Sequence, residues 1–309
     1  MSRPRPLGED TWLLDTELAG QTEMVGVFAQ RLPNGRWLLI EAGSGATTGA
    51  VRAALRELGA GEGDLAAIVV THVHLDHAAG AGTLSAAYDA PVYVHPAGAR
   101  HLADPTRLWN SAARIYGDRM DRLWGPMEPV AERRLRTLDD GATLEIGGAR
   151  YGVLHTPGHA KHHLTLIDPH GGAFVGDAAG ILLPGVPEIR PALPPPDVDL
   201  EAAEASCERI AAARPSRLLL THFGVVRDVA GHLAEVVRRN RAWAEEVRRG
   251  MAAHEDEEAL IRRMRTLEEA ELDAAGVRDP DARARYRASS DARMTVMGLT
   301  RYWNRREAA

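Results

Sequence analysis

The apolar positions of this chain fall into short runs, separated by polar turns and by segments with helical periodicity. Residues 65–70 are apolar throughout and precede a polar turn, which is typical of a buried strand. Strands are predicted at 12–14, 24–29, 37–40, 65–71, 91–95, 142–146, 151–155, 163–167, 173–177 and 217–222. Helices are predicted at 48–59, 78–88 and 198–213, and from about 228 onward. Because strands followed by a helix occur twice, we expect an α/β fold of two sheets packed face to face with helices outside.

Two segments stand apart from this scheme. Residues 105–136 carry large apolar side chains at near-helical spacing among charged ones, which predicts a helical insert. Residues 10–230 are expected to form the main domain, and 231–309 a charged C-terminal helical extension. The apolar stretch 297–303 is expected to pack back on the core or on a second subunit, so a homodimer is one candidate assembly.

The net charge and the cysteine count narrow the classes of protein. The net charge is −6, which argues against a general nucleic-acid binder because such proteins carry a basic surface. Cys207 is the one cysteine, so no disulfide can form within the chain and a reducing compartment is expected. The sequence shows no secretory signal and no apolar span of roughly 18 residues. We therefore expect a soluble, cytoplasmic protein that acts on a small molecule and binds neither nucleic acid nor membrane.

The segment Thr71-His72-Val73-His74-Leu75-Asp76-His77 carries the strongest chemical signal. It places three imidazoles and a carboxylate directly after the predicted strand 65–70, where the backbone turns and the side chains can converge. Neutral imidazole and carboxylate are ligands of Zn²⁺. A solvated loop could hold one or two histidines by chance, but four potential ligands at this spacing predict a metal site.

Three later positions complete the predicted cluster, each near the end of an apolar strand: His159, Asp177 and His222. Seven ligands are too many for one tetrahedral zinc and suit two metal ions. The natural division places three histidines on one ion and a mixed set on the other, with one carboxylate between them. These sets are His72, His74 and His159; Asp76, His77 and His222; and the bridging Asp177.

This residue set resembles the signature of the metallo-β-lactamase superfamily, His-x-His-x-Asp-His followed by a His, an Asp and a His. The resemblance covers about residues 10–230 and implies an αβ/βα sandwich with the metals at one edge of the sheets. The best-known β-lactamase subclass has a cysteine in the second metal site, whereas Cys207 matches no motif here. The chain is therefore more similar to the glyoxalase II and lactonase branches.

The leading hypothesis is a metallo-hydrolase with two zinc ions, iron or manganese being the alternative metals. It would cleave an ester-like bond, such as a lactone or a thioester, with a metal-bound hydroxide. Asp76 would orient the nucleophile and carry its proton to the leaving group, as the resemblance implies. The insert either packs on the core or forms a lid, and Tyr116 within it could donate a hydrogen bond to the oxyanion. The lid residues would be Trp109, Tyr116, Met120 and Trp124.

Two other functions stay open. Persulfide dioxygenases resemble the same motif but bind one iron, and the matching ligands would be His72, His159 and Asp177. A non-catalytic scaffold, stabilised by metal and binding a partner through its helical tail, is the third hypothesis.

Six of the remaining histidines are assigned supporting or surface roles. His163 is expected to support a metal ligand rather than to bind metal itself. Five more are expected on the surface: His101, His162, His170, His232 and His254.

Overall fold

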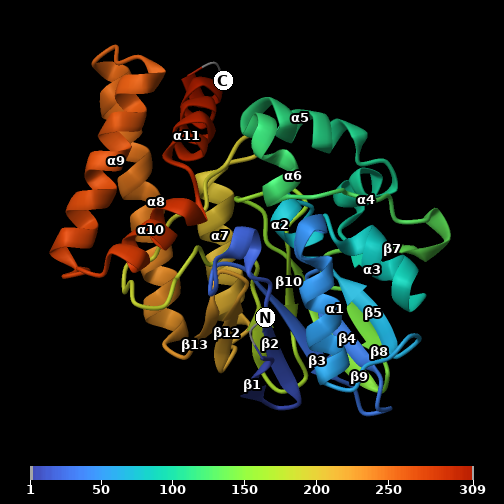
Figure 1. Cartoon of the computed structure of the whole chain (residues 1–309). Helices are drawn as coiled ribbons and strands as arrows, with labels where there is room; N and C mark the ends of the chain where they lie inside the picture. The colour runs from blue at the N-terminus through green and yellow to red at the C-terminus, as the bar shows by residue number, and fades with distance from the viewer. Residues whose placement is uncertain (1–2, 308–309) are drawn as a thin grey trace.

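Two β-sheets packed against each other form the centre of the molecule in this computed structural model, which describes residues 3–307 (Figure 1). The first sheet has the order β1 (Arg5–Gly8), β2 (Thr11–Asp15), β3 (Gly26–Arg31), β4 (Trp37–Ile40), β5 (Leu65–Val69), β6 (Val92–Val94) and β7 (Leu135–Thr137). The second has the order β13 (Gly224–Val226), β12 (Arg217–Leu220), β11 (Gly172–Phe174), β10 (Leu164–Ile167), β9 (Ala149–His155) and β8 (Thr143–Ile146).

Parallel pairing occurs in both sheets, from β4 through β7 in the first and between β11 and β12 in the second. Strand β5 is buried at all five positions, which explains its uninterrupted apolar run. The two sheets meet through side chains such as Phe28 and Phe174, whose rings lie 5.2 Å apart in an edge-to-face arrangement. The carboxyl ends of the parallel strands open toward one end of the sandwich, where the chain turns into polar loops.

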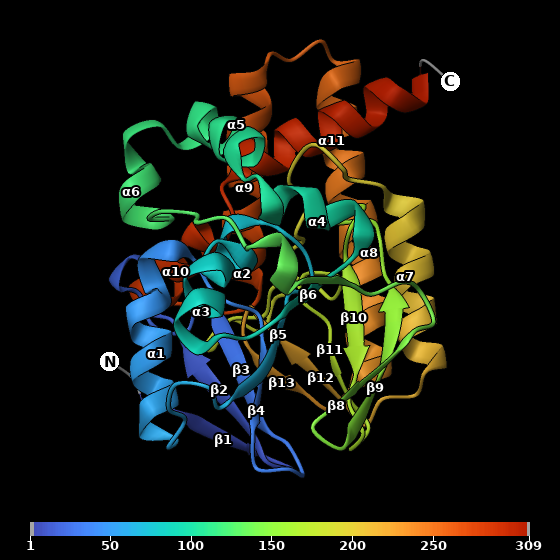
Figure 2. The same ribbon diagram turned by 90° about the vertical axis from the view of Figure 1, so that its right-hand side faces the viewer.

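Helices cover the outer faces of both sheets, as Figure 2 shows: α1 and α3 lie beside the first sheet, α7 and α8 beside the second. Before β7 the helices are α1 (Thr48–Glu57), α2 (Leu75–Ala78), α3 (Ala81–Tyr88), α4 (Pro96–Ala103), α5 (Thr106–Tyr116) and α6 (Met120–Leu123). After β11 they are α7 (Leu200–Ala212), α8 (Val229–Ala252), α9 (Glu257–Ala274), α10 (Pro280–Ser289) and α11 (Ala292–Glu307). Single 3₁₀ turns lie at η1 (Leu18–Gly20), η2 (Gly45–Thr47), η3 (Gly117–Arg119) and η4 (Glu132–Arg134). The predicted α/β sandwich with a helical insert and C-terminal helices is therefore confirmed.

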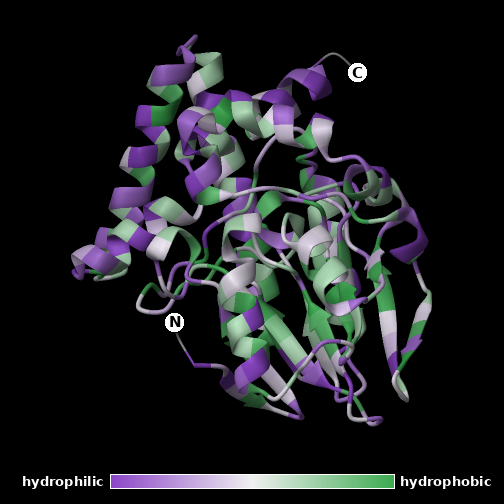
Figure 3. Cartoon of the chain, turned by 45° about the vertical axis from the view of Figure 1, so that its right-hand side comes forward, coloured by the Kyte–Doolittle hydropathy of each residue, from purple (hydrophilic) through white to green (hydrophobic). Residues whose placement is uncertain are grey.

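The C-terminal helices bury an apolar face while keeping a polar exterior (Figure 3). In α11, Leu299 and Tyr302 pack in one cluster with Trp243 and Val247 of α8. The apolar stretch 297–303 thus packs on the chain's own helices, which is the first of its two predicted placements. The division into domains at about residue 230 and the homodimer stay predictions. Within residues 3–307, no helix is both long and apolar enough to cross a bilayer.

Candidate metal centre

The segments that follow strands of both sheets bring the predicted ligands together. His72 and His74 follow β5, and Asp76 and His77 lie in the short helix α2. The other three follow strands of the second sheet: His159 comes after β9, Asp177 after β11 and His222 after β12. Side chains that are far apart in sequence therefore meet at one end of the sandwich, between the sheets.

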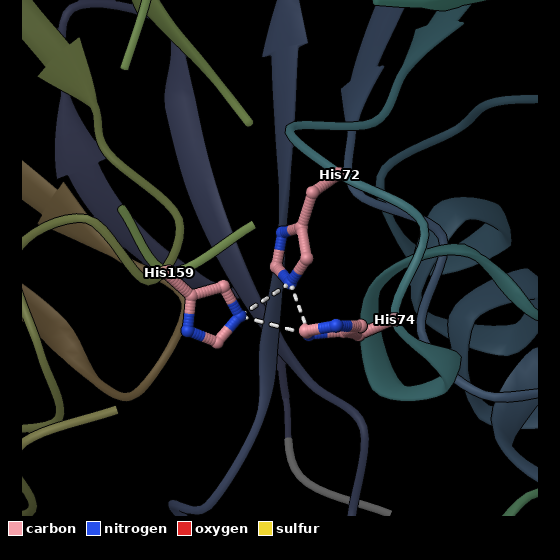
Figure 4. A group of neighbouring side chains, drawn as sticks. All are labelled: His72, His74 and His159. Atoms are coloured by element: carbon pink, nitrogen blue, oxygen red, sulfur yellow. Dashed lines mark hydrogen bonds between the residues drawn. The ribbon is translucent and has the colours of Figure 1, made fainter. Parts of the chain in front are cut away.

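Three imidazoles form the first group of ligand atoms, shown in Figure 4. Nε2 of His72 lies 3.0 Å from Nδ1 of His74 and 3.1 Å from Nε2 of His159, and the last two atoms are 2.8 Å apart. Nitrogen ligands held at 2.0–2.1 Å by a tetrahedral zinc would be about 3.3 Å apart, a similar spacing. The geometry of this group is that of a three-histidine metal site.

The second group consists of Asp76, His77 and His222, and Asp177 lies between the two groups. Nε2 of His222 is 3.4 Å from Oδ2 of Asp76 and 3.5 Å from Oδ1 of Asp177. The other oxygen of Asp177, Oδ2, lies 3.3 Å from Nε2 of His159 in the first group. One carboxylate thus has an oxygen facing each group, as a bridging ligand would.

The partners of the ring nitrogens show which atom of each histidine is available. Nδ1 of His159 lies 2.8 Å from the carbonyl oxygen of Ala192, and Nδ1 of His222 lies 2.7 Å from that of Met24. A carbonyl only accepts, so each Nδ1 carries a hydrogen, and in the neutral ring Nε2 is the nitrogen left to bind metal. Metal-binding histidines are held in this way by an acceptor on the far nitrogen.

Glu41 is the acceptor for Nδ1 of His77, although no motif in the sequence singles out Glu41. Its Oε1 lies 3.0 Å from Nδ1 of His77 and accepts from the hydroxyl of Thr71 at 2.5 Å. Nδ1 of His72 lies 3.0 Å from the same hydroxyl oxygen, so its hydrogen also points away from the ligand group. Glu41 is fully buried just after β4 and orients two histidines, directly and through Thr71.

Unpartnered polar atoms indicate that the cluster fits a cation. Nε2 of His77 and Oδ1 of Asp177 lie 3.1 Å apart, and neither of these buried atoms has a well-formed hydrogen bond. Nε2 of His72 and of His159 both present lone pairs across 3.1 Å, which is unfavourable unless a positive charge lies between them. Imidazole nitrogens and carboxylate oxygens match the donor set of zinc and related divalent ions.

Charges within the cluster shift the pKa values strongly. Burial would raise the pKa of Asp76, but His77 and His222 beside it lower this pKa to about 2. Burial would lower the pKa of His77, but Asp177, Asp76 and Glu41 raise it well above its usual value. Burial is the main reason why the pKa of His72 lies well below its usual value. The carboxylates stay ionised, and His72 stays neutral, as metal ligands must.

His163 lies one layer behind these atoms. Its Nε2 accepts from the backbone N–H of Asp177 at 3.1 Å, and its Nδ1 lies 2.9 Å from the hydroxyl of Thr156. A side chain on Gly176 would meet the ring of His163 at 2.6 Å, so only glycine allows this approach. The expected supporting role of His163 agrees with this contact to Asp177. The surface assignment is wrong for His162 and His232, which are 8% and 6% exposed.

A cavity of about 480 Å³ opens onto the cluster of candidate ligands. The ligand residues that line it are His74, Asp76, His159, Asp177 and His222. Its side walls come from η1, from α5 and α6 of the insert, and from the segment that joins α10 to α11. The sequence had left the role of the C-terminal helices open.

The insert lies beside the cavity, although only part of the expected lid lines it. Tyr116 and Trp124 line the cavity, and their rings pack edge to face at 5.1 Å. Trp109 and Met120 do not line it, and both pack into the main apolar core instead. The burial of Tyr116, reinforced by the charge of Asp76, raises the pKa of its hydroxyl, which therefore keeps its hydrogen at neutral pH.

Comparison with known proteins identifies the family. The model of the metallo-beta-lactamase superfamily matches residues 25–222, which contain every ligand of the cluster. The chain belongs to the metallo-β-lactamase superfamily. The predicted resemblance is therefore confirmed.

Several relatives are similar to parts of this superfamily member. A metallo-beta-lactamase fold-containing protein of Sulfurisphaera tokodaii is 29% identical over 163 residues, 52% of this chain and 60% of the relative. A hydroxyacylglutathione hydrolase of Bdellovibrio bacteriovorus is 30% identical over 115 residues, 37% of this chain and 34% of the relative. The chain thus spans less than two thirds of the length of these curated relatives.

A solved structure shares the fold over nearly the whole chain. The metallo-beta-lactamase family protein from Thermus thermophilus superposes with a TM-score of 0.71 and 22% identity. The match covers 98% of this chain and 96% of that protein, so it includes the C-terminal helices. This likeness supports the fold alone.

Proposed function

We propose that this protein is a metal-dependent hydrolase that cleaves an ester-like bond, such as a lactone or a thioester. The observation that carries the proposal is the position of Asp177, whose two oxygens face two separate groups of ligand atoms at the base of the cavity. Two divalent ions, with zinc as the first candidate, fit these groups. The partial similarity to hydroxyacylglutathione hydrolases supports the thioester as one substrate class.

The candidate ligands fall into two sets, one for each proposed ion. His72, His74 and His159 would hold one ion, Asp76, His77 and His222 the other, and Asp177 would contact both. Bound ions of this kind supply a Lewis acid that lowers the pKa of water and polarises a carbonyl group.

Two side chains around the cavity have proposed roles in the reaction. The side chain of Asp76 is 21% exposed, compared with 7% for Asp177, so Asp76 is the carboxylate that a substrate can reach. Its carboxylate would orient the attacking water, accept a proton from it and pass that proton to the leaving group. The hydroxyl of Tyr116 would donate a hydrogen bond to the carbonyl oxygen as this oxygen gains negative charge.

The test combines metal analysis with turnover. Protein purified without added metal is expected to hold about two divalent ions per chain and to hydrolyse members of a panel of lactones and thioesters. His72→Ala and His159→Ala should lose both metal and turnover, whereas His170→Ala, at a partly exposed site away from the cluster, should keep both. Full activity in His72→Ala would disprove the proposal, and one iron per chain with little zinc would favour the persulfide dioxygenase hypothesis.

A further inference from the structure

The cavity contains two cations that the metal chemistry does not use. Arg119, in η3, and Arg122, in α6, both line the cavity that reaches the metal cluster. Neither guanidinium has a hydrogen bond or an ion pair within the described residues 3–307. Asp118 and Asp121 are their neighbours in sequence, yet no ion pair forms with them.

The third arginine that lines the cavity, Arg287, has its guanidinium paired with a carboxylate. Arg287 donates from Nε to the carboxylate of Glu269 at 2.5 Å, and its pKa is raised mainly by that hydrogen bond. Arg119 has an aromatic contact instead, because its guanidinium carbon lies 5.7 Å from the ring centre of Tyr116. The ring of Tyr116 packs in turn on Trp124, so the position of Arg119 is linked to the wall of the cavity.

Apolar side chains line the same cavity as these arginines. Leu108, Ala112 and Ile115 of α5 form one side, and Met294 of α11 lies on the C-terminal side. Figures 1 and 2 both show α5 and α11 at the same end of the molecule. A ligand that reaches from the metals to the arginines would therefore meet both apolar side chains and two positive charges in the same cavity.

We propose that the substrate carries an anionic group, a carboxylate or a phosphate, which Arg119 and Arg122 bind while its ester-like bond lies at the metal centre. This inference rests on the proposed function for the reacting bond, but the anion subsite can be tested by binding alone. Guanidinium groups bind carboxylate and phosphate oxygens through paired N–H donors. Both arginines are exposed to solvent, so a neutral substrate would leave them hydrated and would form no ion pair with them.

Arg114 provides a matched control for an exposed arginine of the insert. It lies in α5, is exposed and has no ion pair among residues 3–307, but it does not line the cavity. Arg114→Gln removes the same charge from the same insert without touching the subsite. The double variant Arg119→Gln/Arg122→Gln removes both proposed contacts, and metal content and circular dichroism show whether each variant is folded.

Binding is measured on metal-loaded protein with two matched pairs of ligands that differ only in one charged group. The first pair is pantetheine and 4′-phosphopantetheine, whose common thiol makes any contact with metal the same for both. The second pair is hexanoyl ethanolamide and adipoyl ethanolamide, which differ by a terminal carboxylate. In isothermal titration calorimetry, the anionic ligand of one pair is expected to bind about tenfold more tightly than its neutral counterpart. The pair that shows this preference identifies the anion as a phosphate or a carboxylate.

The variants decide the assignment. The preference should be lost in Arg119→Gln/Arg122→Gln and retained in Arg114→Gln. Equal binding within both pairs, or a preference that survives in the double variant, would overturn the proposal. The corresponding thioesters test the reaction separately: if none is hydrolysed while the arginine-dependent preference persists, the proposed function fails and the anion subsite stands.

Discussion

Glu41 and His77 are 36 residues apart in sequence, yet Oε1 of Glu41 lies 3.0 Å from Nδ1 of His77. Both side chains are completely buried. Because the carboxylate accepts the Nδ1 hydrogen, Nε2 of His77 faces Asp177 and the second ligand group. Glu41, which is not itself proposed as a metal ligand, therefore determines which nitrogen of His77 faces the metal site.

Glu41→Gln is expected to weaken metal binding at the second group by about 10–100-fold. The amide keeps the shape of the side chain but loses the negative charge that orients the His77 ring. Competition with a chromophoric chelator measures the affinity directly. Glu62→Gln, at an exposed position, is the control. An unchanged affinity in Glu41→Gln would show that His77 needs no such partner.

Metal binding is expected to release at least one proton per chain near neutral pH. In metal-free protein, the carboxylates of Asp177, Asp76 and Glu41 raise the pKa of His77 well above its usual value, and the pKa of His222 is also raised. The metal needs the neutral imidazole, so binding must displace the proton, and affinity should fall as the pH drops below the raised pKa. Calorimetric zinc titrations in two buffers of different ionisation enthalpy count the protons. A count of zero at neutral pH would contradict this assignment.

The candidate ligands that lie close together in sequence were the easiest part of the site to predict. The segment 72–77 places four potential ligands within six positions, and strand β5 before it is apolar throughout, so periodicity and residue type suffice. His159, Asp177 and His222 were predictable because each comes after a strand with an apolar pattern. Glu41 looked like any acidic residue in a glycine-rich loop, since its significance depends on a contact with His77 that no local pattern encodes.

Three of the four edge strands were missed for a related reason. Strands β1, β7 and β13 contain three or four residues each and are only partly buried, so they show no clear alternation. Strand β7 also overlaps the end of the predicted helical insert, 105–136. The C-terminal wall of the cavity could not be predicted either, because it depends on how helices α10 and α11 pack against the sandwich.

Tyr116→Phe is expected to lower kcat by about 10²-fold while leaving the metal content unchanged. The hydroxyl lines the cavity, and its raised pKa keeps the hydrogen available for donation to an oxyanion. The phenylalanine ring retains the packing on Trp124, so loss of the wall should not explain the effect. Steady-state kinetics on the best lactone or thioester separates kcat from KM. A change confined to KM would indicate that Tyr116 shapes the cavity without stabilising the transition state.

Arg190→Met is expected to lower the free energy of unfolding by about 3–5 kcal/mol, because it leaves a buried carboxylate without its counter-ion. Arg190 is 0% exposed and Glu268 is 2% exposed, and Nη2 of Arg190 donates to Oε1 of Glu268 at 2.6 Å. The same nitrogen donates to the carbonyl oxygen of Ser290, which lines the cavity. Urea denaturation followed by circular dichroism measures the loss.

The double variant Arg190→Met/Glu268→Met should recover most of that stability, because removing both charges also removes the cost of burying them. Arg238→Met, which breaks an exposed pair with Glu235, should cost less than about 1 kcal/mol. If the double variant were instead the least stable of the three, the attraction between Arg190 and Glu268 would not account for the loss. Packing of the guanidinium on Tyr286, 4.8 Å from its ring centre, would then be what holds the loop of Arg190 to the C-terminal helices.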